Sequence, residues 1–225
     1  MHPPGEQILE SVFRAEHVMD SASKIVFSDG FGNLYYHIAP SRTAMSSQQT
    51  VRQEFGTVKD NPVRLDTEKA KQSIDALNSD LAATYVLYHQ LRKHHWNVDG
   101  AEYGQLHDWF GDAAEDAEEA ADEMAERVGA LGGVPISGPA ALEEHAPVDF
   151  EGADVYDVRT SMENDLELYG DVIEYIREHV MLVENLGDYA TSELFRERLE
   201  ELEADADDLK SFLAADTLVL ESATH

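Results

Sequence analysis

Two histidines and two carboxylates stand at spacings suited to a metal site: His95, His107, Asp122 and Glu126. Imidazole and carboxylate groups are the usual protein ligands of redox-active iron. Asp122 and Glu126 are four residues apart, so on a helix they share one face and can reach one ion together. These four residues therefore predict a binding site for redox-active iron.

The spacing within this set limits how such a site can be built. Between the turn at Gly100 and the stop at Gly132-Gly133 the sequence reads as one helix, on which His107 and Asp122 lie roughly 22 Å apart. Metal–ligand bonds are only about 2 Å long, so one ion cannot touch both residues of the same chain. Either the two pairs are unrelated, or a second subunit that runs antiparallel completes the site.

Each pair also has an ordinary structural interpretation. In a chain this acidic, Asp122 and Glu126 fit solvated surface acids. The two histidines fit aromatic packing beside Trp96 and Trp109. Taken singly, each residue suits a structural role better than a catalytic one, so the iron hypothesis depends on the four acting together.

The elements that must position these residues are long amphipathic helices, because apolar residues recur every three or four positions. The predicted bounds are about 66–96, 102–131, 154–186 and 190–213. The connection between the second and third helices is too long for antiparallel neighbours and carries a predicted short helix at 139–145. The predicted fold is all-α, a ferritin-like four-helix bundle with a long B–C crossover that contains the short helix.

An iron site inside the bundle is not predicted. Ferritins proper carry Glu-x-x-His pairs that project into the bundle core. No histidine of this chain has a glutamate three residues before it. Any iron site is therefore expected at a surface of the bundle.

The chain outside the bundle divides into three segments. Residues 1–44 form an N-terminal extension, with a predicted strand–turn–strand at 23–38. It is either an appended arm or, because Met45 reads like a natural start, an upstream extension that the function does not need. Residues 45–65 are polar and aperiodic, as expected of a flexible arm. The bundle occupies 66–213, and 214–225 is a loosely ordered C-terminal tail.

Charge and composition narrow the class of protein. The net charge is -30, from 46 acidic and 16 basic residues, which disfavours binding to DNA or to anionic membranes. Much of this acidity is expected to reflect halophilic adaptation, since charge is strongly screened in concentrated salt. There is no cysteine, which excludes disulfides and thiolate metal sites. With no signal peptide and no apolar window long enough to span a membrane, the expected location is cytoplasmic.

Residues from about 66 to 213 resemble the Dps family, the DNA-binding proteins from starved cells, also called mini-ferritins. The likeness rests on HHWNVDG with Leu106-His107 after it, and on DEMAERVGALGGVP. The family pattern has a His before Trp, a His twelve residues later, an Asp fifteen further on and a Glu four after that. His95, His107, Asp122 and Glu126 fit this pattern without a gap, and the acidity is similar to that of haloarchaeal members.

The resemblance implies a function and an assembly. It implies two subunits packed antiparallel, each site taking its histidines from one chain and its Asp and Glu from the partner, in a hollow homo-oligomeric shell of twelve subunits. Ferrous iron would be the substrate, oxidised at these ferroxidase sites preferably by hydrogen peroxide and stored as a ferric mineral, which protects against oxidative damage. Trp96 would lie beside the site as a radical trap.

The chain departs from the family pattern at one position and leaves other roles open. Many members have an acidic residue four positions after the second histidine, where this chain has Gly111. We therefore expect a second iron to bind more weakly, or through Asp108 or Asp112. Glu115 and Glu119 are further expected to nucleate mineral, and Glu184 and Glu193 to line an acidic pore. Ordinary solvated surface acid is an equally good interpretation of these four residues.

Three functional hypotheses remain at this point. The leading one is an iron-oxidising and iron-storing enzyme. The second is a structural or DNA-compacting shell without chemistry, although residues 45–65 contain only Arg52, Lys59 and Arg64 as basic residues. The third is an acidic scaffold that binds cations through diffuse charge, which predicts no effect of replacing either histidine.

Overall fold

The structure is a computed structural model that describes residues 24–28, 34–38 and 50–214. The chain divides into two compact units, one up to Val51 and the other from Arg52 onwards. In the first unit, β1 (Lys24–Ser28) pairs antiparallel with β2 (Leu34–Ile38), which confirms the two predicted strands. The rest of the predicted extension 1–44, residues 45–49 of the predicted arm and 215–225 of the tail lie outside the described residues.

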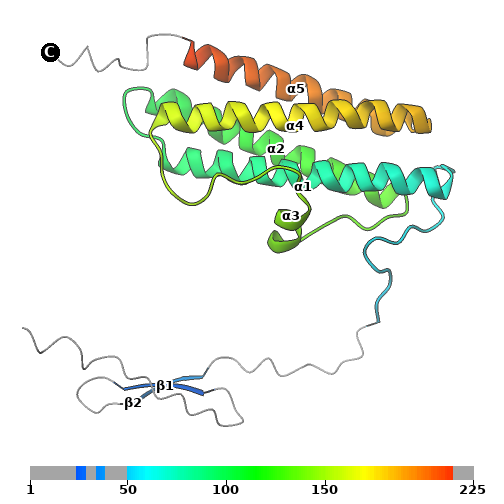
Figure 1. The fold of residues 1–225 in the computed structure, drawn as a ribbon, viewed down its shortest axis with the longest axis horizontal. Coiled ribbons are helices and arrows are strands. Elements are labelled where there is room, and N and C mark those ends of the chain that lie inside the picture. Colours follow the sequence, from blue (N-terminus) through cyan, green and yellow to red (C-terminus); the bar gives the residue numbers. More distant parts are fainter. Residues whose placement is uncertain (1–23, 29–33, 39–49, 215–225) are drawn as a thin grey trace, which may run out of the picture. The chain divides into compact units, whose positions relative to one another are not determined.

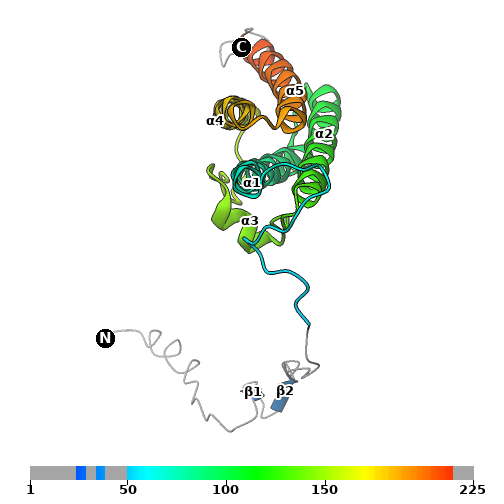
Figure 2. The same ribbon diagram turned by 90° about the vertical axis from the view of Figure 1, so that its right-hand side faces the viewer.

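The second unit is the predicted helical bundle, which confirms the all-α, ferritin-like fold. Four long helices lie side by side in Figure 1 and are seen end-on in Figure 2, with one short helix beside α1. Their bounds are α1 (Thr67–Asn97), α2 (Tyr103–Ala130), α3 (Pro139–His145), α4 (Val158–Leu186) and α5 (Tyr189–Leu213). Two ends follow the sequence directly: the Asp66 carboxylate accepts the amide of Glu68, and Gly187 ends α4 in the left-handed region at φ 82°.

One predicted boundary was wrong. The third long helix begins at Val158, not near Asp154. The Asp157 carboxylate accepts the backbone amide of Thr160 at 3.1 Å and its hydroxyl at 2.7 Å, so this residue caps the helix. The apolar periodicity extended the prediction one turn too far, because the exposed side chain of Val155 belongs to the preceding loop.

Contacts between helices set the topology. Between α1 and α2, Arg92 lies 3.5 Å from Glu115 and Thr84 Oγ1 lies 4.0 Å from Met124 Sδ. Between α1 and α4, Asp80 bonds His179 and His94 bonds Asp165. In each pair the residue numbers run in opposite directions, so both α2 and α4 are antiparallel to α1 and parallel to each other. Parallel neighbours in the chain need a long crossover, as the sequence predicts.

The crossover follows α1 and is attached to it at both ends. At one end, Asn78 accepts the amide of Ile136 at 2.8 Å. At the other, Glu151 binds both His94 Nε2, at 2.6 Å, and Lys93 Nζ, at 2.5 Å. Burial of these charges is tolerated because each has a hydrogen-bonding partner.

Part of the segment predicted as a flexible arm contacts the end of α2. The backbone amide of Lys59 and the side-chain amide of Gln53 each donate to the Gly132 carbonyl at 2.9 Å. Gly132 has φ +87°, and a Cβ there would collide with the Lys59 carbonyl. The glycine that ends α2 is therefore also the point on which this segment docks.

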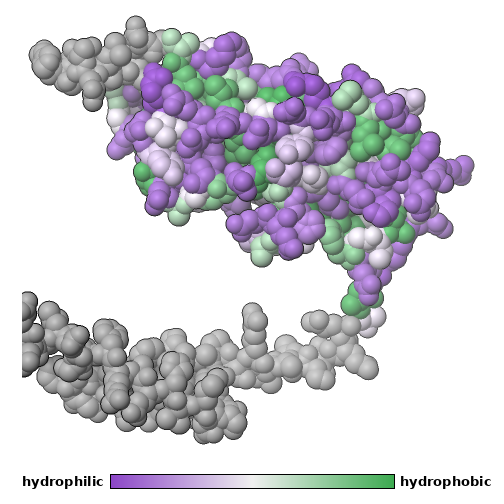
Figure 3. All heavy atoms as spheres, viewed as in Figure 1, coloured by the Kyte–Doolittle hydropathy of each residue, from purple (hydrophilic) through white to green (hydrophobic). Residues whose placement is uncertain are grey.

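Hydrophilic residues cover most of the bundle face seen in Figure 3. In the described part of the chain, no helix combines the length and the apolar character that crossing a membrane requires.

Candidate metal centre

The two predicted histidines lie together where α1 ends and α2 begins. The ring centroids of His95 and His107 are 3.8 Å apart, and His95 Nδ1 lies 2.7 Å from the His107 carbonyl oxygen. A carbonyl can only accept, so Nδ1 of His95 carries the proton and Nε2 keeps its lone pair. This backbone bond fixes the orientation of the His95 ring, as the outer-shell bonds of metal-binding histidines do.

The turn between the helices brings the pair together. Gly100 adopts φ +100°, which lets the chain reverse between α1 and α2. Tyr103, one turn before His107, packs on the His107 ring with centroids 5.1 Å apart. Tyr103 is not among the predicted site residues, although its i, i+4 spacing to His107 was the available signal.

Gly111 is needed for the position of His95. A Cβ on Gly111 would lie 3.1 Å from both Cε1 and Nδ1 of the His95 ring, so the ring rests directly on the backbone of α2. An acidic side chain at this position would displace the ring. The departure from the family pattern is thus linked to how this chain packs its first histidine.

Gly111→Ala is expected to move the His95 ring and to lower the initial rate of iron oxidation about 10-fold, because small misplacements of reacting groups are costly. The rate would be followed by ferric absorbance at fixed salt. Gly170→Ala is the matched control, since a Cβ on that α4 glycine meets nothing within 4 Å. Equal rates in Gly111→Ala and Gly170→Ala would show that the close packing of His95 has no role in the reaction.

The carboxylate pair lies further along α2. Asp122 and Glu126 are both exposed, one helical turn apart. Asp122 is eleven residues from Gly111, which touches His95, and this corresponds to about 16 Å along the helix. Within the residues that the structure describes, no three histidine, aspartate or glutamate side chains gather closely enough to hold a metal ion. The structure thus keeps the two predicted pairs apart; they are called below the histidine half-site (His95 and His107) and the carboxylate half-site (Asp122 and Glu126), after the role that the resemblance implies for them.

The remaining predicted residues occupy varied settings. Trp96 follows His95 and is 72% exposed. Glu115 forms its 3.5 Å ion pair with Arg92, whereas Glu119 is exposed. Near the α4–α5 turn, Glu184 is paired with Arg196, and Glu193 is exposed. The ion pairs leave Glu115 and Glu184 less available to cations than sequence alone suggests.

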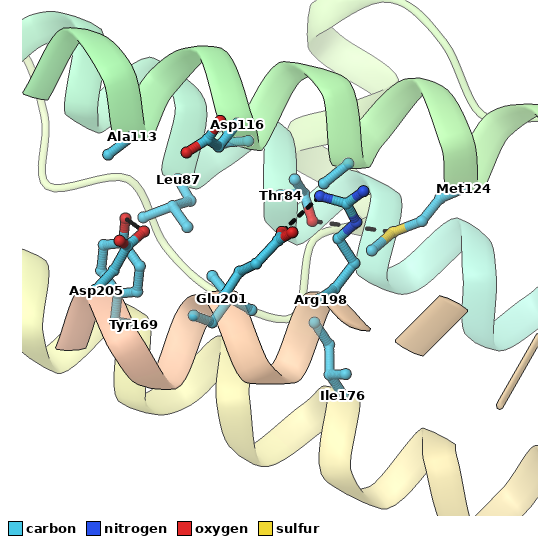
Figure 4. Close-up of a pocket in the computed structure, with 13 residues that line it drawn as sticks. Thr84, Leu87, Ala113, Asp116, Met124, Tyr169, Ile176, Arg198, Glu201 and Asp205 are labelled. Carbon is cyan, nitrogen blue, oxygen red and sulfur yellow. Dashed lines mark hydrogen bonds and ion pairs between the residues drawn. The ribbon is translucent and has the colours of Figure 1, made fainter. Parts of the chain in front are cut away.

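An arginine side chain lines a cavity in the bundle interior. Figure 4 shows Arg198 pointing into a cavity of about 30 Å³, and its Nη1 lies 2.6 Å from Glu201. Deeper in the cavity, the Tyr169 hydroxyl donates to Asp205 at 3.0 Å. Burial raises the pKa of Asp205 to about 6, and the nearby charge of Asp116 acts in the same direction. Among the described residues, the cavity lining contains Arg198 together with the carboxylates of Asp116, Glu201 and Asp205, and no histidine.

Comparison with known proteins identifies the family to which the chain is similar. Residues 74–219 match the family described as "Ferritin-like domain". The "DNA protection during starvation protein" of Halobacterium salinarum is 56% identical over 180 residues, which is 80% of this chain and 99% of that protein. A crystal structure of an archaeal Dps homologue from the same organism superposes with a TM-score of 0.74 at 55% identity, covering 79% of this chain and 99% of that one.

A more distant structure extends the likeness. Dps from Vibrio cholerae, described as a member of a broad superfamily of ferritin-like diiron-carboxylate proteins, is 29% identical with a TM-score of 0.66, covering 70% of this chain and 98% of that one. The chain therefore belongs to the Dps family of ferritin-like proteins.

Proposed function

We propose that this protein is a ferroxidase that stores iron: it oxidises Fe²⁺ at sites shared by two antiparallel subunits and keeps the ferric product inside a hollow homo-oligomeric shell, most simply a dodecamer. The observation that carries the proposal is the histidine half-site. His95 is held by the His107 carbonyl with Nε2 free, and the two rings lie 3.8 Å apart. A preorganised pair of imidazoles at the surface is suited to bind a ferrous ion.

The partner subunit would complete each site. An antiparallel two-fold arrangement pairs the same surface of both subunits, so the histidine half-site of one faces the carboxylate half-site of the other. Imidazole suits ferrous iron, while the hard carboxylates of Asp122 and Glu126 favour the ferric product. This difference in ligand preference drives oxidation at the site.

Hydrogen peroxide is the proposed oxidant because it accepts two electrons and two sites can supply them. Two ferrous ions give one electron each, the O–O bond breaks, and two solvent protons complete two water molecules. No hydroxyl radical is released when both electrons arrive. The reaction would then protect the cell from oxidative damage as well as store iron.

The charge of the protein supports cation uptake. A net charge of -30 attracts Fe²⁺ and repels nucleic acid phosphates. The names of relatives refer to DNA protection, and oxidation of iron would achieve protection without direct DNA binding. We further propose halophilic adaptation, nucleation of mineral at Glu115 and Glu119, and iron entry past Glu184 and Glu193.

The test is anaerobic loading of the salt-stabilised protein with Fe²⁺, followed by peroxide or air, with ferric absorbance as the readout. His95→Ala and His107→Ala are each expected to lower the peroxide-driven rate at least about 10-fold, since even indirect changes at metal ligands cost that much. His145→Ala, an exposed histidine on α3, is the control. Equal, slow oxidation in all four proteins would favour the acidic scaffold, and rapid assembly without oxidation would favour the structural shell.

A further inference from the structure

Three aromatic rings of α1 form a continuous row on the bundle surface. The ring centroids are 6.2 Å apart for Tyr85 and Tyr88 and 5.0 Å apart for Tyr88 and His89. The Arg92 guanidinium lies 5.6 Å from the Tyr88 ring centroid. Both tyrosines are half-buried and His89 is exposed, so this aromatic row (Tyr85, Tyr88 and His89) lies within reach of chemistry at the surface.

The pairing of α1 with α2 places one end of the row at the carboxylate half-site. Arg92 contacts Glu115 at 3.5 Å, and Thr84 Oγ1 lies 4.0 Å from Met124 Sδ. Because the helices are antiparallel, this register sets Tyr85 opposite Asp122. The electrostatics agree: burial raises the pKa of Tyr85, and the charges of Glu118 and Asp122 raise it further.

The other end of the row approaches the histidine half-site. Arg92, which covers Tyr88, is three residues before His95 on α1. From Tyr85 to His95 the helix rises about 15 Å. The aromatic row thus occupies the stretch of surface between the two half-sites of one chain. If the sites are completed by an antiparallel partner, an iron ion lies near each end.

Reduction of hydrogen peroxide requires more electrons than one ferrous ion gives, and an aromatic row can carry the second one. Hydrogen peroxide takes up two electrons, whereas a ferrous ion supplies one, and transfer of a single electron splits peroxide into hydroxide and a hydroxyl radical. Two iron ions roughly 15–20 Å apart, as the helix spacing implies, cannot both touch one peroxide molecule. Where a site holds a single iron, as the glycine at position 111 leads us to expect, the second electron must reach that site through the protein.

We propose that the aromatic row supplies this second electron, with Tyr85 and Tyr88 as its redox-active groups. This inference rests on the proposed ferroxidase function. One ferrous ion and one tyrosine hydroxyl each give an electron to hydrogen peroxide, and the O–O bond breaks. The phenolic proton and one solvent proton complete two water molecules, leaving a ferric ion and a neutral tyrosyl radical. A ferrous ion at the other end of the row then reduces the radical, and a solvent proton restores the hydroxyl.

The experiment limits iron so that the second electron cannot come from a second ion. The full chain is loaded anaerobically with far fewer ferrous ions than sites, so that few pairs of sites hold two ions. It is then mixed with peroxide and freeze-quenched for electron paramagnetic resonance. A parallel sample contains a spin trap for hydroxyl radicals. The proteins compared are the parent, Tyr85→Phe/Tyr88→Phe, and the control Tyr175→Phe/Tyr189→Phe, whose tyrosines lie on α4 and α5.

The parent and the control are expected to show a tyrosyl radical signal and little spin adduct. Tyr85→Phe/Tyr88→Phe is expected to lose that signal and to form several-fold more hydroxyl adduct, while size-exclusion chromatography shows an unchanged assembly. Equal signals and equal adduct in all three proteins would overturn the inference and leave the ferroxidase standing. Failure of the proposed function would look different, because His95→Ala would then oxidise iron as fast as the parent.

Discussion

Two inactive variants of this protein are expected to recover about a quarter of the parental rate of iron oxidation when they assemble together. One variant, His95→Ala/His107→Ala, lacks the histidine half-site. The other, Asp122→Asn/Glu126→Gln, lacks the carboxylate half-site. In a mixed dimer, one site combines both defects, whereas the second combines the intact histidines of one chain with the intact carboxylates of its partner.

The expected fraction follows from the symmetry of the pair. Random mixing makes about half of the dimers mixed, and each mixed dimer has one intact site of two, so about a quarter of all sites are complete. The variants would be co-expressed with different affinity tags, isolated by both tags in succession, and assayed with peroxide at fixed salt.

The control is a doubly tagged assembly made from the histidine-lacking variant alone, which is expected to stay inactive. Mixed assemblies that remain at the background rate would show that the half-sites do not combine across an interface. The separation of His95 from Asp122 within one chain would then have another explanation. The roughly 16 Å between the two half-sites makes restoration by a single chain geometrically impossible.

Asp165→Ala is expected to lower the free energy of unfolding by about 3–5 kcal/mol, because it removes one partner from a buried charged network. Asp165 is fully buried on α4 and accepts from Gln90 at 2.9 Å and from His94 at 2.7 Å. Without it, His94 loses this carboxylate partner in a buried site. Asp75→Ala, which breaks an exposed i,i+4 pair with Lys71, is the control and should cost less than about 1 kcal/mol.

The network also predicts a pH dependence. Burial would lower the pKa of His94, but hydrogen bonds to Asp165 and Glu151 outweigh it and raise that pKa above its ordinary value of 6.5. A raised folded pKa means that the folded state binds the proton more tightly than the unfolded state. The stabilisation from His94 is therefore complete below pH 6.5 and is lost as the pH rises through the raised pKa.

Denaturant unfolding of the parent and Asp165→Ala would be followed from pH 6 to alkaline pH at constant salt. The difference in the free energy of unfolding between the two proteins is expected to shrink as the pH rises. Asp165→Asn, which keeps the shape and one acceptor for Gln90, tests the charge alone if the alanine variant does not fold. If the loss of unfolding free energy relative to the parent stays constant with pH in both variants, the network stabilises the fold only by packing.

The sequence by itself determined the helices and the types of the site residues, because both are local properties. Helical periodicity depends on neighbours three and four positions apart, and Asp66 caps its helix through amides two and three residues away. Spacing along a helix also decides that His107 and Asp122 cannot bind one ion. The start of α4 was missed because periodicity does not reveal that Asp157 caps the helix. Its carboxylate accepts the backbone amide of Thr160.

Only the tertiary structure decided how the site residues are oriented and which contacts hold them in place. The free Nε2 of His95 depends on a carbonyl twelve residues away, and the need for Gly111 depends on a ring from another helix. The charged network that fastens the crossover joins His94 to residues 57 and 71 positions distant. Such contacts arise from the register between helices, which is set by packing across the whole bundle and has no signature in the local sequence.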